Sequence, residues 1–255
     1  MAKKQGRMTK GKMAHTIPID APLYPSLPIR YRNVEYLIFT YETDEEAALD
    51  VLPDKLELEL PATATIVFLD IPYCTLGAYH EAYIALDAYL DGEPVHYVVY
   101  NVMDNDAAVA VGREVWGVPK KMGHIIFESK AEAMIGAMER PLGTRIVTGI
   151  VRPEFVAKDV HPAPRPLVTL RIIPHPEGKE PLIHLIEHFN AKTANFKHGP
   201  GWEEFQLRGE GSITFTAQSA VDPWHKFKVI RMLDALYSGG PSSFDLNYGK
   251  ILKTL

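Results

Sequence analysis

The chain has 255 residues, of which 46% are hydrophobic and 23% charged, so it can bury a sizeable core without disulfides or structural metals. The formal net charge of −5 argues against a nucleic-acid-binding protein, because that affinity depends on clustered positive charge facing phosphates. A single cysteine, Cys74, favours a reducing, cytoplasmic location, and no stretch approaches the ~20 consecutive apolar residues of a membrane-spanning helix.

The chain begins with a basic segment. Its first thirteen residues carry five basic side chains and no acidic one, and they lack the apolar run of a secretory signal. We therefore predict a flexible basic tail over residues 1–17, followed by a single domain over residues 18–255. Four prolines between residues 18 and 28 predict an entry segment that runs extended over the surface.

Strand-forming sequence dominates the rest of the chain. Six segments are rich in β-branched and aromatic residues and are separated by turn-forming Gly, Pro, Asn and Asp. These segments are residues 31–40, 63–69, 95–103, 143–151, 166–173 and 211–216. Because the strands do not alternate regularly with helices, we predict a β-rich α+β fold, with a mostly antiparallel sheet or barrel and one or two packed helices.

Helix signals occur at two places. Thr43 and Glu46 have the spacing of a capping box ahead of a short apolar run, and Pro53 lies where this helix should end. The second place, residues 226–237, has two open interpretations. An Asp-Pro pair just before it would begin a helix, whereas its apolar residues also alternate as they do in a strand.

The most informative segment is VGREVWGVPKKMG, residues 111–123. Lys120 and Lys121 follow an apolar stretch over residues 107–118 that we interpret as strand-forming, and Pro119 fixes the backbone just before them. Adjacent lysines alone are typical of a solvated surface. This setting instead predicts two lysines that emerge at the end of a buried strand.

Lys120 needs a strongly lowered pKa to act as a nucleophile. An ordinary lysine pKa near 10.4 leaves roughly one molecule in a few thousand uncharged at neutral pH, and a pKa near 7 requires about 5 kcal/mol against the ammonium. A second ammonium ~6 Å away supplies ~3 kcal/mol at an effective dielectric constant of about 20, so Lys121 alone is not enough. Neighbouring side chains of a strand also point to opposite faces. Desolvation by Trp116 and Val118 must therefore supply much of the change.

The lysine segment resembles the signature of the acetoacetate decarboxylase superfamily, through Gly112, Arg113 and Glu114 and then through Pro119-Lys120-Lys121. The likeness begins at about Tyr24. It includes the further segments NVEYLIFTYETD (33–44), YHE (79–81), LRIIPHPEG (170–178) and NAKTANF (190–196).

The resemblance implies a fold and three catalytic residues. Lys120 matches the nucleophile that forms a Schiff base, Lys121 matches its neighbouring lysine, and Glu81 matches the active-site glutamate. The implied fold is a double β-barrel of mostly antiparallel strands with a few packed helices, assembled into a homo-oligomer.

Two positions depart from the family pattern. Val34 stands where the decarboxylases carry an arginine for the substrate carboxylate, and Ile66 stands where they carry a second glutamate. Arg32 precedes Val34 by two residues on a predicted strand, so it should project from the same face and reach a carboxylate from a shifted position. The alternative is that Arg32 lies at the rim and pairs with an acid.

Arg113 also has two open interpretations. It can pair with Glu114 and support the lysine segment, or it can contact an anionic substrate. We include Arg113 among the candidate substrate-binding residues, together with Arg32, Trp116 and Val118.

A metal-ligand pattern is present near residue 185. His184, Glu187 and His188 match the H-x-x-E-H pattern of one zinc-protease class. The segment is short, closely follows Pro181, and aligns with a strand in the resembled family, which would turn the side chains differently. We therefore interpret the histidines as ordinary surface or core residues, and predict neither a metal nor another cofactor. Motifs for nucleotide binding and serine hydrolysis are missing from the sequence as well.

The sequence thus predicts an enzyme that forms a Schiff base between Lys120 and a small keto acid, such as acetoacetate, and decarboxylates it. Two alternatives stay open. One is aldolase or dehydratase chemistry of the same superfamily on pyruvate-like acids, and the other is a non-catalytic protein that binds a small molecule. We expect a keto acid and further copies of this chain as partners, and no nucleic acid or membrane.

Overall fold

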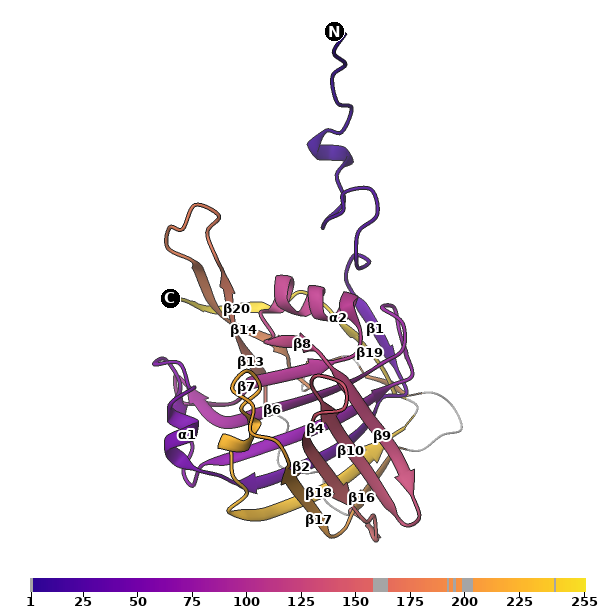
Figure 1. Ribbon diagram of the computed structural model, residues 1–255, viewed down its shortest axis with the longest axis vertical. Helices are drawn as coiled ribbons and strands as arrows, with labels where there is room; N and C mark the ends of the chain where they lie inside the picture. The colour runs from indigo at the N-terminus through magenta and orange to yellow at the C-terminus, as the bar shows by residue number, and fades with distance from the viewer. Residues whose placement is uncertain (1, 158–164, 192, 195, 199–203, 241) are drawn as a thin grey trace.

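The computed structural model describes residues 2–157, 165–191, 193–194, 196–198, 204–240 and 242–255 (Figure 1). Within these residues, the chain forms three β-sheets and a few short helices. None of the described helices is both long and apolar enough to cross a membrane.

The large sheet forms the centre of the molecule. Its strands are β2 (Glu35–Glu42), β3 (Glu57–Leu58), β4 (Thr63–Ile71), β6 (Tyr79–Leu90), β7 (Glu93–Met103), β8 (Lys120–Met122), β12 (Phe155–Val156), β13 (Leu167–Ile173), β14 (Leu182–Phe189), β16 (Phe205–Arg208), β18 (Arg231–Gly239) and β20 (Lys250–Thr254). They lie in the order β12-β16-β18-β2-β4-β6-β7-β13-β14-β20, with β3 beside β6 and β8 beside β7.

Two smaller sheets complete the fold. The second sheet has the order β17-β11-β10-β9, and the third has the order β15-β19-β1-β5. Their strands are β9 (His124–Lys130), β10 (Ala133–Glu139), β11 (Arg145–Val151) and β17 (Gly211–Phe215), and then β1 (Ile29–Arg32), β5 (Tyr73–Cys74), β15 (Lys197–His198) and β19 (Ser242–Leu246). The helices are α1 (Glu45–Leu49), α2 (Asp106–Val111), the π-helical turn η2 (Gly112–Trp116), and the 3₁₀ turns η1 (Lys10–Lys12) and η3 (Trp224–Lys226).

The strand pairing confirms a β-rich, mostly antiparallel fold. Among the described strands, the only parallel pairings are those of β7 with β8 and of β7 with β13. The double barrel implied by the resemblance stays a prediction, because none of the three strand orders closes on itself within the described residues.

The two faces of the large sheet have different surroundings. Alternate residues of its central strands, such as Phe39 on β2 and Phe68 on β4, point toward the second sheet and form the main core. The two sheets approach closely at Gly136, where an added Cβ would lie 2.4 Å from the Phe68 ring. The opposite face, which carries residues such as Tyr36 and Tyr83, lines the cavities described below.

All six predicted strand segments contain strands. The segment 31–40 divides into β1 and β2, because Asn33 has a positive φ of 55° and interrupts the extended chain. Segment 226–237, for which both interpretations were open, contains the end of η3 and most of β18. The strand interpretation therefore holds for its second half.

Two local predictions were wrong. The first helix begins one residue later than predicted: Asp44, rather than Thr43, caps it and accepts a hydrogen bond from the Ala47 amide. Within residues 107–118, which we interpreted as strand-forming, residues 107–116 are helical, because they contain most of α2 and all of η2. Asn105 caps α2 by accepting from the Ala108 amide, a signal that the strand interpretation overlooked.

The first residues extend away from the sheets (Figure 1). They return to the body through the Thr16 hydroxyl, which donates a hydrogen bond to Glu114, and through Tyr24, which donates to the same carboxylate at 2.5 Å. The flexibility of residues 1–17, and a single domain over residues 18–255, stay predictions.

Candidate active site

Lys120 begins the short strand β8 and points into the protein. The strand pairs in parallel with β7, which places Lys120 beside Asn101. Only 6% of Lys120 is exposed, and its Nζ lies 3.8 Å from Oε2 of Glu81 on β6. Asn101 donates a 2.6 Å hydrogen bond to the other oxygen of this carboxylate and thereby fixes its orientation. Glu81 therefore lies beside Lys120.

The backbone before Lys120 is shaped to admit its side chain. An added Cβ on Gly112 would lie 2.3 Å from Cδ of Lys120, so only glycine leaves room for the lysine chain. The Val118 amide donates to the Gly112 carbonyl at 3.0 Å, and Arg113 donates to the Lys120 carbonyl at 3.1 Å. The helical turn and β8 are thus held together as one unit.

Arg113 and Glu114 do not pair with each other in the structure. The Arg113 side chain is bonded to the Lys120 backbone, whereas Glu114 accepts from Thr16 and Tyr24. Arg113 therefore supports the lysine segment, which was one of its two interpretations. It does so by binding the Lys120 carbonyl rather than by pairing with Glu114. Arg113 does not line the cavity around Lys120.

A cavity of about 110 Å³ surrounds the Lys120 ammonium group, and we call it the lysine cavity. Its walls are largely aliphatic and aromatic and include Trp116 and Val118, as predicted. Glu81 supplies a carboxylate to the cavity and Lys120 supplies an amine. Lys120 is the only Lys or Arg among the described residues that line the cavity.

Burial lowers the pKa of Lys120, while the nearby Glu81 carboxylate opposes this effect by favouring the ammonium. The direction agrees with the requirement for an uncharged amine, and the cause is the predicted one, namely desolvation rather than a neighbouring cation.

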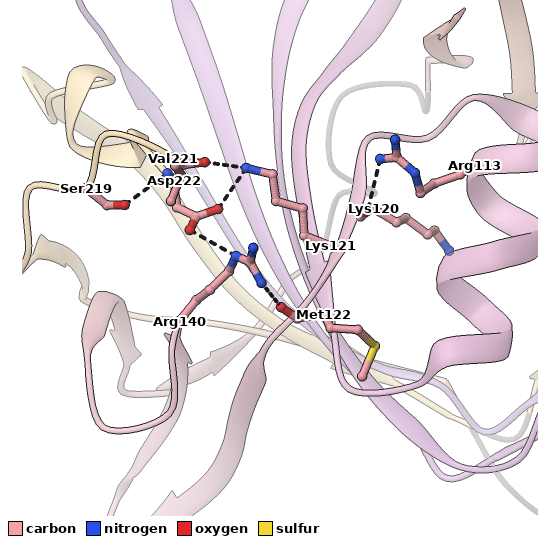
Figure 2. Close-up of polar contacts among 8 residues, drawn as sticks. All are labelled: Arg113, Lys120, Lys121, Met122, Arg140, Ser219, Val221 and Asp222. Atoms are coloured by element: carbon pink, nitrogen blue, oxygen red, sulfur yellow. Dashed lines mark hydrogen bonds and ion pairs between the residues drawn. The ribbon is translucent and has the colours of Figure 1, made fainter. Parts of the chain in front are cut away.

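Lys121 lies on the other side of β8 (Figure 2). Its Nζ contacts the Asp222 carboxylate at 3.0 Å and also donates to the Val221 carbonyl. Arg140 binds the second oxygen of Asp222 at 3.0 Å, so this buried carboxylate has two cationic partners. Lys121 is therefore outside the lysine cavity and anchors β8 to the loop before η3.

Several polar residues of the lysine cavity were missed by sequence reasoning. Tyr31, Tyr36, Tyr79 and Tyr83 come from three different elements and line the cavity together. Burial raises the pKa of each of these phenols, so all four stay protonated and can donate hydrogen bonds at neutral pH. No local motif marks them, because their proximity arises from strand pairing.

His188 also lines the lysine cavity, in a role different from the metal ligand that was considered. Burial lowers its pKa to about 3, with a further contribution from the charge of Lys120. The ring is therefore neutral, and its Nδ1 has no hydrogen-bond partner among the described residues. His184, Glu187 and His188 lie on β14, as the likeness to a strand indicated, and no described group of three His, Cys, Asp or Glu side chains is arranged to hold a metal.

Arg32 does not reach Lys120. It is exposed, and its guanidinium lies 5.7 Å from the centre of the Tyr73 ring, in a separate surface cavity shared with Arg30 and Lys197. The argument from strand alternation failed because Asn33 interrupts the strand between Arg32 and Val34. Val34 itself lines the lysine cavity.

Ile66 does not line the lysine cavity either. It is fully buried and faces the main core, on the side of the sheet opposite Glu81. Leu69 is the β4 residue directly across from Glu81, and it lines the cavity. The polarity of the cavity therefore depends on position 69 rather than on position 66.

The fold and this cavity define a class of β-sheet protein that encloses one lysine beside one carboxylate within apolar walls. The family model for acetoacetate decarboxylase (ADC) matches residues 16–254. The chain belongs to the acetoacetate decarboxylase family.

Individual relatives agree with this assignment. The chain is 30% identical over 245 residues to decarboxylase DEC1 of Cochliobolus heterostrophus, covering 92% of this chain and 93% of that protein. It is 31% identical over 187 residues to an acetoacetate decarboxylase of Chromobacterium violaceum, covering 71% and 75% of the two proteins.

Solved structures share the fold. A structure of acetoacetate decarboxylase superposes with a TM-score of 0.85 and 23% identity, over 97% of this chain and 99% of that chain. The enduracididine biosynthesis enzyme MppR in complex with pyruvate superposes with a TM-score of 0.74 and 19% identity, over 95% and 98% of the two chains.

Proposed function

We propose that this protein is a decarboxylase of a β-keto acid and that Lys120 forms a Schiff base with the substrate. The observation that carries the proposal is the environment of Lys120, which is buried, has a lowered pKa and lies 3.8 Å from Glu81 in an apolar cavity. The relatives named acetoacetate decarboxylase support the same class of reaction.

The first half of the reaction forms the imine. The lone pair of neutral Lys120 attacks the ketone carbon, and loss of water from the resulting carbinolamine gives a protonated imine. Glu81 is close enough to accept the proton that the amine loses and to pass it to the departing hydroxyl group. Asn101 keeps the carboxylate aimed at the amine during these transfers.

The second half breaks the carbon–carbon bond. The electron pair of the bond to the carboxylate moves toward the positive imine nitrogen, which releases carbon dioxide and leaves an enamine. Glu81 or a cavity water then protonates the enamine carbon, and hydrolysis returns the free amine of Lys120. The apolar walls, including Trp116 and Val118, favour uncharged carbon dioxide over a solvated carboxylate.

A second candidate is aldolase or dehydratase chemistry through the same imine. It is favoured by the lack of any cation besides Lys120 among the described residues of the lysine cavity, and by the shared fold with MppR, which was solved with pyruvate. A protein that binds a keto acid without turnover is the remaining alternative.

Borohydride trapping tests the nucleophile. The protein is incubated with acetoacetate, pyruvate and longer keto acids, reduced, digested and mapped by mass spectrometry. We expect a mass increase on the peptide with Lys120 in the wild type and in Lys121→Ala, and none in Lys120→Ala. Persistent absence of label over the whole panel would refute the Schiff-base proposal, and label on another lysine would refute the assignment of Lys120.

Product analysis separates the reactions that share the imine. Release of carbon dioxide together with the matching ketone identifies the decarboxylase. Condensation or dehydration products from pyruvate with an aldehyde identify the second candidate, and label without any product identifies a binding protein.

The cellular setting and the assembly belong to the same proposal. The composition favours a cytoplasmic location and a flexible basic tail over residues 1–17, and the resemblance implies a double-barrel arrangement and a homo-oligomer. Size-exclusion chromatography with light scattering measures the number of subunits directly.

A further inference from the structure

The lysine cavity is small for a complete ligand site. Its volume of about 110 Å³ lies below the roughly 300–1,000 Å³ that is typical of small-molecule pockets. A second cavity of about 390 Å³ adjoins it on the same face of the large sheet, and we call this the sheet-face cavity. The two cavities share five lining residues: Val34, Tyr36, Tyr83, Leu167 and Phe189.

The register of three central strands connects the two cavities. Tyr36, Leu69 and Glu81 lie side by side on β2, β4 and β6, and they form the row that faces Lys120. The next row on the same face is Ile38, Val67 and Tyr83, and the third is Thr40, Thr65 and Ala85.

These rows lead away from the nucleophile. Successive rows are about 6.6 Å apart, since residues of one face are two positions apart along a strand. The second and third rows line the sheet-face cavity, so Ala85 lies roughly 13 Å along β6 from Glu81. The floor is therefore continuous from the lysine cavity into the sheet-face cavity.

The floor of the sheet-face cavity is mainly apolar, through Ile38, Val67, Ala85 and Leu167. Thr40 and Thr65, the two threonines of the third row, are within hydrogen-bond distance of each other, at 3.2 Å between their hydroxyl oxygens. This surface suits a hydrocarbon chain.

The far end of the sheet-face cavity does not suit a second charged group. Arg165 is there, but its guanidinium binds Glu59 and lies 3.7 Å from the Asp87 carboxylate. Asp87 also binds the His96 ring at 2.8 Å, and Glu204 adds another carboxylate to the wall. A ligand with a negatively charged tail would meet two carboxylates and a cation that already has partners.

Val34 stands at the boundary between the two cavities. Valine at this position places an apolar side chain, rather than a charged one, between the two cavities. Position 34, where the family pattern has an arginine, is therefore compatible with an uncharged substituent that reaches from one cavity into the other.

We propose that the substrate is a β-keto acid with an extended, uncharged apolar substituent on the ketone. The ketone and carboxylate occupy the lysine cavity, and the substituent passes Val34 and lies along the second and third rows of the sheet-face cavity. This inference rests on the proposed function, because it places the ketone at Lys120.

A homologous series tests the length of the substituent. Decarboxylation is measured for acetoacetate, β-ketohexanoate, β-ketooctanoate and β-ketodecanoate with the wild-type protein. We expect kcat/KM to rise roughly two- to fourfold for each added methylene that becomes buried, until the cavity is filled. A constant or falling kcat/KM along the series would overturn the proposal.

Two variants locate the substituent. Ile38→Phe fills the second row and Ala85→Phe fills the third, so we expect the rise in kcat/KM to stop at a shorter acid in Ile38→Phe than in Ala85→Phe. Ile150→Phe adds similar bulk on the second sheet, outside both cavities, and should behave like the wild type. Equal losses for acetoacetate and β-ketodecanoate in the two cavity variants would contradict the assignment.

A binding experiment separates this inference from the proposed chemistry. Calorimetry with β-hydroxybutyrate and β-hydroxydecanoate, which cannot form an imine, measures the tail site alone. If the wild type binds β-hydroxydecanoate more tightly than β-hydroxybutyrate, and Ala85→Phe does not, the sheet-face site is supported even if no imine is ever trapped. Trapping of acetoacetate on Lys120 together with release of carbon dioxide, but without any preference for length, would uphold the decarboxylase and refute the extended substrate. Thermal melting of each variant shows whether it is folded.

Discussion

Lys120 and Lys121 are adjacent in the chain, but their ammonium groups lie on opposite sides of β8 (Figure 2). Lys120 faces Glu81 in the lysine cavity, whereas Lys121 contacts Asp222. In acetoacetate decarboxylase, a neighbouring cationic group is the usual explanation for the lowered pKa of the catalytic lysine. In this chain, burial is the main cause of the lowered pKa.

Replacing Lys121 should therefore affect stability more than chemistry. We expect Lys121→Ala to keep the pH dependence of imine formation, and to lose roughly 1–2 kcal/mol of unfolding free energy because Asp222 loses one of its partners. Borohydride trapping as a function of pH and urea denaturation measure the two effects. A large upward shift in the pH required for trapping would show that Lys121 acts on the nucleophile after all.

Removal of the charge of Glu81 should change the pH profile in a defined direction. The carboxylate favours the ammonium form of Lys120, so Glu81→Gln should lower the pKa of Lys120 and allow imine formation at lower pH. Turnover should nevertheless fall by roughly 10²–10⁴-fold, because the proton acceptor is lost. Glu81→Asp, which retains the charge, is the matched comparison, and a profile in Glu81→Gln that moves to higher pH would contradict the assignment.

Gly112 should tolerate no side chain. Alanine at this position would bring a Cβ to 2.3 Å from Cδ of Lys120, so the lysine must leave its present position. We expect Gly112→Ala to abolish borohydride trapping and to cost roughly 1–3 kcal/mol through overpacking. Gly11→Ala is the control, because nothing lies within 4 Å of its added Cβ. Normal trapping in Gly112→Ala would mean that the lysine chain reaches the cavity by another path.

Asp222 should be the most important acidic residue for the stability of β8. It is 2% exposed and binds both Lys121 and Arg140, so Asp222→Asn should lower the free energy of unfolding by roughly 1–3 kcal/mol. Asp245→Asn removes an exposed ion pair with Arg30 at 3.9 Å and should change the free energy of unfolding by only about 0–1 kcal/mol. Urea denaturation of both variants gives the comparison, and equal effects would exclude an anchoring role of Asp222.

His188 should make the protein sensitive to acid. The folded protein holds its pKa near 3, while the unfolded chain binds a proton on this residue below about 6.5, so acid favours unfolding. The resulting loss of stability should extend from about pH 6.5 down to about pH 3, with a slope of up to ~1.4 kcal/mol per pH unit. His188→Asn should flatten the dependence of the urea midpoint on pH over this range.

His80 provides a comparison of opposite sign. Its hydrogen bond to Asp104 raises its pKa, so this pair stabilises the folded state below that raised value, as long as Asp104, whose own pKa is lowered by His80, stays ionised. The contribution of His80 is lost as the pH rises through the raised value. His80→Asn should therefore lose stability mainly on the acidic side. The same slope in both variants would mean that neither histidine governs the response.

The sequence revealed those parts of the fold that depend on local pattern. The six strand segments and the two residues Lys120 and Glu81 came from strand-forming composition and from the family motif, and the structure contains the strands and brings these residues together. The local pattern gave a wrong prediction at residues 107–118, where valine and tryptophan indicated a strand. The segment begins as a helix, which Asn105 caps.

Other features depend on contacts that are distant in sequence. The positive φ of Asn33, which turns Arg32 away from Val34, cannot be read from alternation alone. Asp222, the aspartate of the Asp-Pro pair before residues 226–237, was considered only as the start of a helix. Its partners Lys121 and Arg140 come from other parts of the chain. The rows of the sheet-face cavity require the register of three strands, which composition does not specify.

The strands β2, β4 and β6 carry structural packing on one face and the sheet-face cavity on the other. Odd and even positions along the same strand therefore serve different purposes. Random libraries confined to Ile38, Thr40, Thr65 and Ala85 should alter which acids are accepted while Phe39 and Phe68 preserve the folded state. The cavity side of these strands can therefore be redesigned without rebuilding the packed side.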